Sequence, residues 1–215
     1  MMYDCFERNK SGGNRENERV NQMQIRLETE KDYTEVERIT RDAFWKEEKV
    51  EDMGVGCDEH FLAHQLRTSK DFVTELDFVA EIEGQIVGNI MYTLAKLLLS
   101  NGTELEVLNF GPLTVAPKFQ NKGIGSALVR HSLEEAKRLG FDAVIIFGHP
   151  NYYPRFGFKE AKEFNITTKD EKNFPAFMAL ELFEGSLHGM GASFQESDAF
   201  IMDPASVIEF DKQFK

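Results

Sequence analysis

The segment between residues 109 and 147 constrains the fold more than any other part of the chain. An apolar strand pattern leads into Gln-Asn-Lys-Gly-Ile-Gly at residues 120–125. Apolar residues then recur at three- to four-residue spacing up to Leu139, as in an amphipathic helix. Gly140 follows as a C-terminal stop, and the unbroken apolar run 143–147 is typical of a parallel strand covered on both faces. The segment predicts a β-α-β unit whose helix begins at a glycine-rich loop.

The start of this helix is suited to binding a phosphate group. A helix N-terminus offers unpaired N–H groups and the positive end of the helix dipole. Gly123 and Gly125 let the backbone approach an anion closely, where a Cβ would obstruct it. Residues 109–133 contain no acid, although the chain has a net charge of −12. The basic residues of this stretch are Lys118, Lys122 and Arg130.

Two common phosphate-binding motifs do not fit this loop. A Walker loop requires Gly-Lys-Ser/Thr, which is absent at residues 120–126. A dinucleotide fingerprint requires a third glycine, where this chain has Leu128, and an acid near the end of the next strand. That strand ends in Gly-His-Pro at residues 148–150, so both motifs are excluded.

The remaining pattern, Gln-x-x-Gly-x-Gly after a strand, resembles the pyrophosphate loop of the GNAT acyltransferase superfamily. A second stretch, Asn-Tyr-Tyr-Pro-Arg-Phe-Gly-Phe at residues 151–158, resembles the family's Tyr-x-x-x-Gly-Phe segment after the fifth strand. The resemblance extends over about residues 23–182 and is greatest to a branch of predicted N-acetyltransferases. It implies acetyl-CoA as the acetyl donor and leaves the acceptor unspecified.

The resemblance also implies how the donor is held. Gly111-Pro112 should interrupt the fourth strand as a bulge does, because proline has no N–H and glycine weakens pairing. In the family the fourth and fifth strands part there, the pantetheine arm pairs with the backbone of about residues 113–115, and a nearby backbone N–H polarises the thioester carbonyl. The cofactor-binding residues implied are Leu113, Thr114, Val115, Gln120, Asn121, Lys122, Gly123, Ile124, Gly125, Ser126 and Asn151.

Tyr153 is the catalytic residue that the resemblance implies. It stands four residues before Gly157, where the family places the tyrosine that protonates the departing CoA thiolate. A phenol with a pKa of about 10 can protonate a thiolate with a pKa of about 8.5 at short range. The neighbouring Tyr152 is the alternative acid.

The sequence leaves the identity of the general base open. Many relatives carry a glutamate midway along the fourth strand, where this chain has Asn109, and an asparagine cannot take a proton. The alternatives are Glu104 and Glu106 near the start of that strand, an ordered chain of waters, or a carboxylate from the first two helices.

The whole chain predicts an α/β fold, in the order strand, two helices, three strands, helix, strand, helix and strand. The resemblance implies a GNAT-like mixed, mostly antiparallel sheet with helices on both faces and a splay between strands 4 and 5. Asp32 is expected to cap the first helix, and the second should begin near Asp58. We expect a disordered segment at 1–22, the acetyltransferase domain at 23–185, and a C-terminal extension at 186–215 packed on it as a strand and a short helix.

Composition excludes several classes of protein. No apolar run approaches the roughly 20 residues that span a bilayer, so we expect no membrane association. The acidic balance argues against nucleic acid as a partner, and two cysteines favour a reducing cytoplasm. Cys57, His60 and His64 share one helical face, but such a spacing is usual for surface or half-buried residues, so we expect no metal.

The leading function is an N-acetyltransferase that moves the acetyl group from acetyl-CoA to an amine by direct attack in a ternary complex. The alternatives are a non-catalytic CoA-binding sensor and a protein-interaction module. Between Glu28 and Glu59 there are twelve acids and five bases, which either attract a cationic small-molecule or peptide amine or form a solvated surface. Homodimers are common in the family, but the sequence does not set the oligomeric state.

Overall fold

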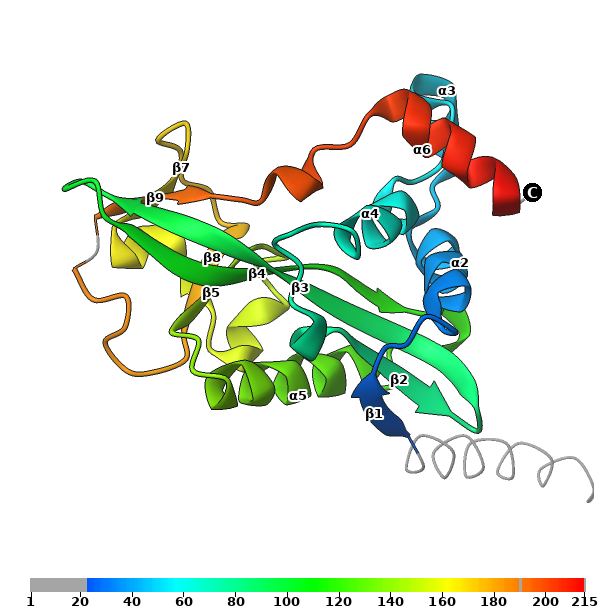
Figure 1. The fold of residues 1–215 in the computed structure, drawn as a ribbon, viewed down its shortest axis with the longest axis horizontal. Helices are drawn as coiled ribbons and strands as arrows, with labels where there is room; N and C mark the ends of the chain where they lie inside the picture. Colours follow the sequence, from blue (N-terminus) through cyan, green and yellow to red (C-terminus); the bar gives the residue numbers. More distant parts are fainter. Residues whose placement is uncertain (1–22, 190, 215) are drawn as a thin grey trace, which may run out of the picture.

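In the computed structural model, which describes residues 23–189 and 191–214, a nine-stranded sheet organises the chain (Figure 1). The strands are β1 (Gln24–Leu27), β2 (Phe78–Ile82), β3 (Gln85–Leu99), β4 (Glu104–Val115), β5 (Ala143–Phe147), β6 (Lys159–Glu160), β7 (Ile166–Thr168), β8 (Phe177–Glu181) and β9 (Ala192–Gln195). The main order is β1-β2-β3-β4-β5-β8-β6, and β9 joins β3 to β7. Only the β4–β5 and β7–β9 pairs of this described sheet are parallel, which confirms the mixed, mostly antiparallel prediction. The predicted disordered segment 1–22 lies outside the described residues.

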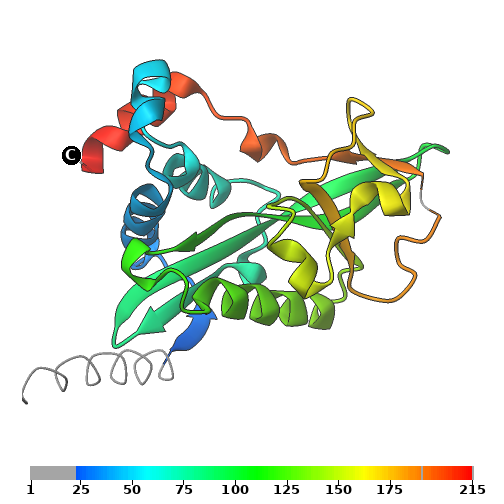
Figure 2. The same ribbon diagram turned by 180° about the vertical axis from the view of Figure 1, so that it is seen from behind.

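Helices cover both faces of the sheet, as predicted (Figures 1 and 2). They are α2 (Tyr33–Phe44), α3 (Glu47–Met53), α4 (Glu59–Leu66), α5 (Ile124–Arg138) and α6 (Pro204–Asp211). Strand side chains alternate between faces, and β2 shows the two layers. Its Phe78 and Ala80 pack in the same cluster as Leu128 of α5, whereas Val79 packs with Val36 of α2. The core therefore lies in two layers, one on each side of the sheet.

The predicted interruption of β4 is present. Tyr92 of β3 pairs with Phe110 and Ile90 pairs with Leu113, so that two β4 residues stand opposite one residue of β3. This bulge falls at Gly111-Pro112, whose peptide bond is cis.

Beyond the bulge, β4 runs free of β5. The described register between them consists of Leu108 opposite Val144, and the strands part after that pair. The splay between the fourth and fifth strands is therefore confirmed.

Three local predictions were wrong. The predicted helix after β5 is a single 3₁₀ turn, Tyr153–Phe156, which ends at Gly157 with a φ of 97°. Helix α3 was missed because none of its seven residues is buried, so it shows no apolar periodicity. Asp32 precedes α2 but does not cap it, because its carboxylate accepts hydrogen bonds from Arg26 and Thr29 instead.

The chain beyond β9 crosses the side of the sheet that carries α2 and α4 and ends in α6, beside α3 (Figure 1). Gln65 of α4 donates to the carbonyl oxygens of Ala199 at 2.7 Å and Ile201 at 3.0 Å. The Arg41 guanidinium of α2 binds Asp211 of α6 at 2.6 Å. These bonds fasten the C-terminal segment across α2 and α4. Within residues 23–189 and 191–214, none of the helices combines the length and apolarity that crossing a bilayer requires.

Candidate active site

A cleft of about 450 Å³ lies where β4 turns into α5. Eight of the predicted cofactor-binding residues line it: Leu113, Val115, Gln120, Asn121, Gly123, Ile124, Gly125 and Ser126. The other lining residues are Phe119, Tyr152 and Arg155. The structure thus brings most of the predicted donor-binding residues to one hollow, at the edge of β4 that β5 leaves uncovered.

The cleft suits an anion. Helix α5 has fifteen residues and no acid in its first turn, so its first N–H groups and dipole are not offset by a carboxylate. Gly123 precedes the helix with a φ of 86°, which glycine adopts without strain. A Cβ at Gly125 would stand 3.1 Å from the Tyr152 hydroxyl, so a larger residue would narrow the cleft. Arg155 adds a positive charge, its guanidinium 4.7 Å from the Tyr152 ring centroid. A diphosphate group therefore fits this lining.

Thr114, Lys122 and Asn151 do not line the cleft. Thr114 is buried, and its hydroxyl lies 2.9 Å from that of Thr40, which ties β4 to α2. The Lys122 ammonium lies 5.4 Å from the Phe119 ring. Asn151 is exposed, and its backbone N–H donates to the His149 ring at 3.2 Å.

The two candidate tyrosines occupy different places. The Tyr152 hydroxyl lies 3.3 Å from the Ser126 hydroxyl, beside the first turn of α5. The Tyr153 ring packs instead against Phe110, the residue of β4 just before the bulge, and the two ring centroids are 5.7 Å apart. Burial, and then the neighbouring Tyr152, raise the pKa of Tyr153, so this phenol keeps its proton at neutral pH.

Gly148 makes room for the Tyr153 ring. A Cβ at Gly148 would lie only 2.4 Å from Cδ2 of that ring. The tyrosine is therefore held against Phe110 by a close approach of backbone to ring at the end of β5.

Asn109 holds a carboxylate that the sequence did not point to. It follows Leu108 in β4, is buried, and donates from Nδ2 to Oε1 of Glu196 at 2.7 Å. Burial raises the pKa of Glu196, while the hydrogen bond from Asn109 opposes that rise. Glu196 is 87 residues away in the sequence, so no local pattern links the two.

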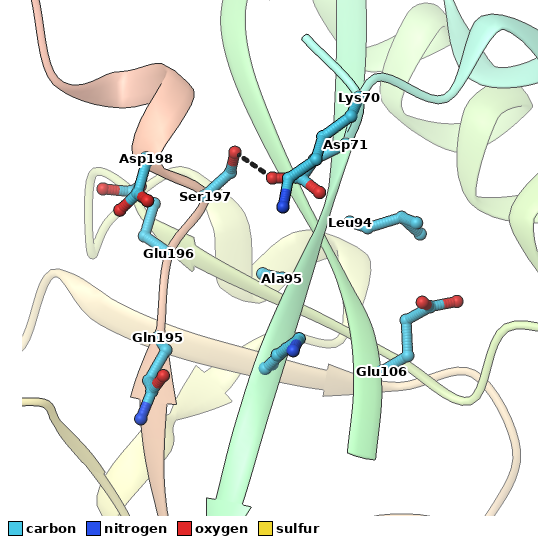
Figure 3. A pocket seen from close by; sticks show the side chains of 10 residues that line it. Lys70, Asp71, Leu94, Ala95, Glu106, Gln195, Glu196, Ser197 and Asp198 are labelled. Carbon is cyan, nitrogen blue, oxygen red and sulfur yellow. Dashed lines mark hydrogen bonds between the residues drawn. The ribbon is translucent and has the colours of Figure 1, made fainter. Parts of the chain in front are cut away.

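Glu196 lines a second cavity, of about 210 Å³ (Figure 3). Its walls come from the loop before η1 (Thr74–Leu76), from β3, from β4 and from the residues at and after β9. The Ser197 hydroxyl donates to the Asp71 carboxylate at 2.6 Å, the bond drawn in Figure 3. The residues lining the cavity are Lys70, Asp71, Leu94, Ala95, Lys96, Glu106, Gln195, Glu196, Ser197 and Asp198.

The cluster around His60 fastens α6. Cys57 Sγ lies 3.3 Å from His60 Nδ1, and His60 Nε2 lies 3.4 Å from Asp211 Oδ1, whereas His64 binds Glu37 at 3.0 Å. Burial raises the pKa of Cys57 to about 12 and lowers that of His60 to about 4, so both are neutral at pH 7. Across the part of the chain that the structure describes, no group of three or more histidine, cysteine or acidic side chains is arranged to hold a metal ion.

The sequence profile of the acetyltransferase (GNAT) domain matches residues 24–161. The chain belongs to the GNAT acetyltransferase family. The uncharacterized N-acetyltransferase YhbS of Escherichia coli K12 is 27% identical over 169 residues, which are 78% of this chain and 92% of that protein. The uncharacterized N-acetyltransferase YjhQ of the same strain is 36% identical over 84 residues, which are 39% of this chain and 46% of that protein.

Solved GNAT structures share the fold. The crystal structure of E. coli YhbS in complex with CoA superposes with a TM-score of 0.71 at 24% identity, covering 83% of this chain and 92% of that one. A GNAT acetyltransferase from Brucella melitensis in complex with acetyl-CoA gives a TM-score of 0.61 at 26% identity, covering 83% and 98%. The predicted superfamily and fold are confirmed, and the chain is an acetyltransferase.

Proposed function

We propose that this GNAT enzyme transfers the acetyl group of acetyl-CoA to an amine by direct attack in a ternary complex. The observation that carries the proposal is the cleft at the start of α5, which opens onto the uncovered edge of β4. The relative from Brucella melitensis, which was crystallised with acetyl-CoA, supports the choice of donor.

The donor would be held mainly by backbone groups. The first N–H groups of α5 would bind the pyrophosphate, with Arg155 as an added cation. Gln120 fixes the loop to the end of β4, because its side-chain amide donates to the Val115 carbonyl at 3.1 Å. The free edge of β4 at Leu113 to Val115 offers the backbone groups with which the pantetheine amides would pair. Acetyl-CoA, as the acetyl-donating substrate, supplies the thioester carbonyl carbon that the amine attacks.

Tyr153 is our candidate for the acid that protonates the departing thiolate. A donor whose diphosphate lies at Gly123 and Gly125 and whose arm follows β4 toward the bulge would place its sulfur near Phe110. Tyr153 packs on Phe110, whereas Tyr152 reaches Ser126 at the opposite end of the cleft. A phenol that stays protonated at neutral pH has a proton to give.

A cationic amine is our candidate acceptor. A groove of about 460 Å³ between α3 and the C-terminal segment is lined by Asp52 and Asp58 together with Phe200 and Met202. Much of the acidic run between Glu28 and Glu59 is neutralised internally; Arg67, for example, pairs with both Glu28 and Glu37. The carboxylates that line the groove, of which Asp58 also lies 3.9 Å from the Lys49 ammonium, would attract an ammonium group.

Two measurements test this proposal. Calorimetry should show acetyl-CoA binding, and a thiol assay should show CoA release with at least one amine of a panel that includes polyamines and lysine peptides. Binding without release for any amine would favour a non-catalytic CoA-binding protein, and absence of binding would remove the donor.

We place the enzyme in the cytoplasm, because its buried Cys57 is a free thiol.

A further inference from the structure

We propose that Glu196 is the general base, the carboxylate that takes a proton from the acceptor amine. This inference rests on the proposed function, because only an amine-acetylating enzyme needs such a group. It assigns a catalytic role to the segment that follows β9, outside the matched family domain at residues 24–161.

The first argument is position. Asn109 is the first residue of β4 beyond the Leu108–Val144 pair, so it stands where β4 and β5 part. Its amide holds the Glu196 carboxylate at 2.7 Å. Two residues further along β4, the place of a Cβ on Gly111 is 3.6 Å from the Phe200 ring. The segment from Glu196 to Phe200 therefore runs along the strand break at which the thioester would lie.

The second argument is the relation of base to acid. Leu108 and Phe110 pack in the core that includes α5, and strand side chains alternate, so Asn109 between them faces the other side of the sheet. Tyr153 is on the Phe110 side and Glu196 on the Asn109 side. A base and an acid on opposite sides of the break let the amine enter from one side and the thiolate leave toward the other.

The carboxylate is also held in place. Residues 192–195 of β9 pair with β3, which fixes the chain just before Glu196. Just after it, the Ser197 hydroxyl binds Asp71, and Gln65 binds the Ala199 carbonyl. A catalytic group positioned by such bonds does not have to be ordered during the reaction.

The surroundings tune Glu196 for proton transfer. Its partial burial favours the neutral acid, and the bond from Asn109 favours the carboxylate, with a net rise in pKa. A base whose pKa moves toward the working pH is more effective than an ordinary exposed glutamate. The other charged groups that line its cavity are Lys70, Asp71, Lys96, Glu106 and Asp198.

The sequence candidates fit this role less well. Glu104 and Glu106 are exposed and precede the point where β4 meets β5. Glu104 is paired with the Lys96 ammonium at 2.5 Å. Neither carboxylate is bonded to the side chain at the strand break, whereas Glu196 is.

The proton balance is complete without a further reactant. The ammonium form of the acceptor gives one proton to Glu196, which passes it to solvent. The amine nitrogen then bonds to the acetyl carbon, the carbon–sulfur bond breaks, and the sulfur takes the Tyr153 proton. The second proton of the new amide nitrogen restores Tyr153. The products are the acetylated amine and free CoA thiol.

The test is Glu196→Gln, which keeps the shape and the bond to Asn109 but cannot take a proton. We expect kcat/KM for the best amine to fall by roughly 10²- to 10⁴-fold, the usual contribution of such a group. The loss should be smallest at low pH, where Glu196 is already protonated in the wild type. Acetyl-CoA affinity should be unchanged. The matched control is Glu134→Gln, which removes an exposed carboxylate of α5 and should behave as wild type.

A second variant separates charge from structure. Asn109→Asp combined with Glu196→Gln exchanges the two functional groups and retains one charge and one hydrogen bond at the pair. We expect it to recover a measurable part of the lost kcat/KM. The assignment of Glu196 would be overturned if Glu196→Gln kept the kcat/KM of the wild type, or if its loss were constant from about pH 5 to pH 10. In either case turnover by the wild-type enzyme would leave the proposed function intact. A wild-type enzyme that binds acetyl-CoA but acetylates no amine would instead remove the proposed function itself.

Discussion

The two sides of the active site are built in different ways. The donor cleft takes most of its lining from one continuous stretch, residues 113–126, and offers backbone N–H groups, glycines and a helix terminus. The side that we propose for the acceptor joins Asp71, Asn109 and Glu196 from segments far apart, through bonds between side chains. The donor side should therefore tolerate changes of polar side chains but not the addition of bulk at a glycine. On the proposed acceptor side, the loss of any one of these side chains should lower the rate of acetyl transfer.

The two sides also differ in charge. Residues 109–133, which include the donor loop, contain no acid, and Arg155 adds a cation at the cleft. Four carboxylates and two ammonium groups line the Glu196 cavity: Asp71, Glu106, Glu196 and Asp198, with Lys70 and Lys96. Under the proposed function, an anionic donor would meet a positive wall and an amine a net negative one.

The largest expected effect on the proposed donor side is that of Gly125→Asp. The Cβ would stand 3.1 Å from the Tyr152 hydroxyl and 3.4 Å from Val115, and its carboxylate would oppose the diphosphate. Acetyl-CoA binding should be lost in calorimetry, while the circular dichroism spectrum stays native because the site is open to solvent. Lys162→Ala, which removes an exposed cation outside the cleft lining, is the control. Unchanged affinity in Gly125→Asp would remove the donor assignment.

The next largest effect should come from Tyr153→Phe, at the junction of the two sides. The ring and its packing on Phe110 remain, but the proton for the thiolate is lost, so kcat should fall by roughly tenfold to several hundredfold. Acetyl-CoA affinity should barely change. Tyr152→Phe is the matched control, since its hydroxyl reaches Ser126 at 3.3 Å and should affect donor affinity more than kcat. The reverse pattern would show that Tyr152 is the acid.

The lining of the proposed donor cleft could be predicted from the sequence because most of it comes from one short stretch of chain. A loop of six residues sets the turn, the helix start and the glycines, and Gly111-Pro112 predicts the bulge without knowledge of the neighbouring strands. Residue 109 shows the limit of this reasoning. Its buried amide is meaningful only beside Glu196, and that contact exists because β9 returns to pair with β3. Helix α3 was not predicted for a different reason. None of its residues is buried, so its sequence shows no apolar periodicity.

Asp211→Asn tests whether the anchor of α6 supports the acceptor side alone. The change weakens the ion pair between Arg41 and Asp211, which is 1% exposed, and should lower stability by roughly 1–3 kcal/mol. Loosening α6 should lower kcat/KM for the amine severalfold and leave acetyl-CoA affinity unchanged. Glu209→Gln removes an exposed carboxylate from the same helix and serves as the control. Equal losses for donor and acceptor would mean that the two sides are not independent.

The smallest expected effect concerns salt and the charge of the acceptor. Attraction between an ammonium group and exposed carboxylates is screened beyond about 8–10 Å at physiological ionic strength. Raising the salt concentration should therefore raise KM for the best amine, by roughly two- to fivefold between dilute buffer and about 0.5 M salt. The value of kcat should hold, because contacts at the reacting atoms are short and partly buried.

The carboxylates responsible can be identified by a variant. Asp52→Asn combined with Asp58→Asn removes both acids that line the groove between α3 and the C-terminal segment. We expect this variant to flatten the salt dependence of the amine KM, whereas Glu134→Gln should not. A KM that ignores salt in the wild type would exclude long-range attraction of the acceptor by these carboxylates. It would leave Glu196 as the proposed base, because taking a proton from the bound ammonium group is a short-range step that needs no long-range field.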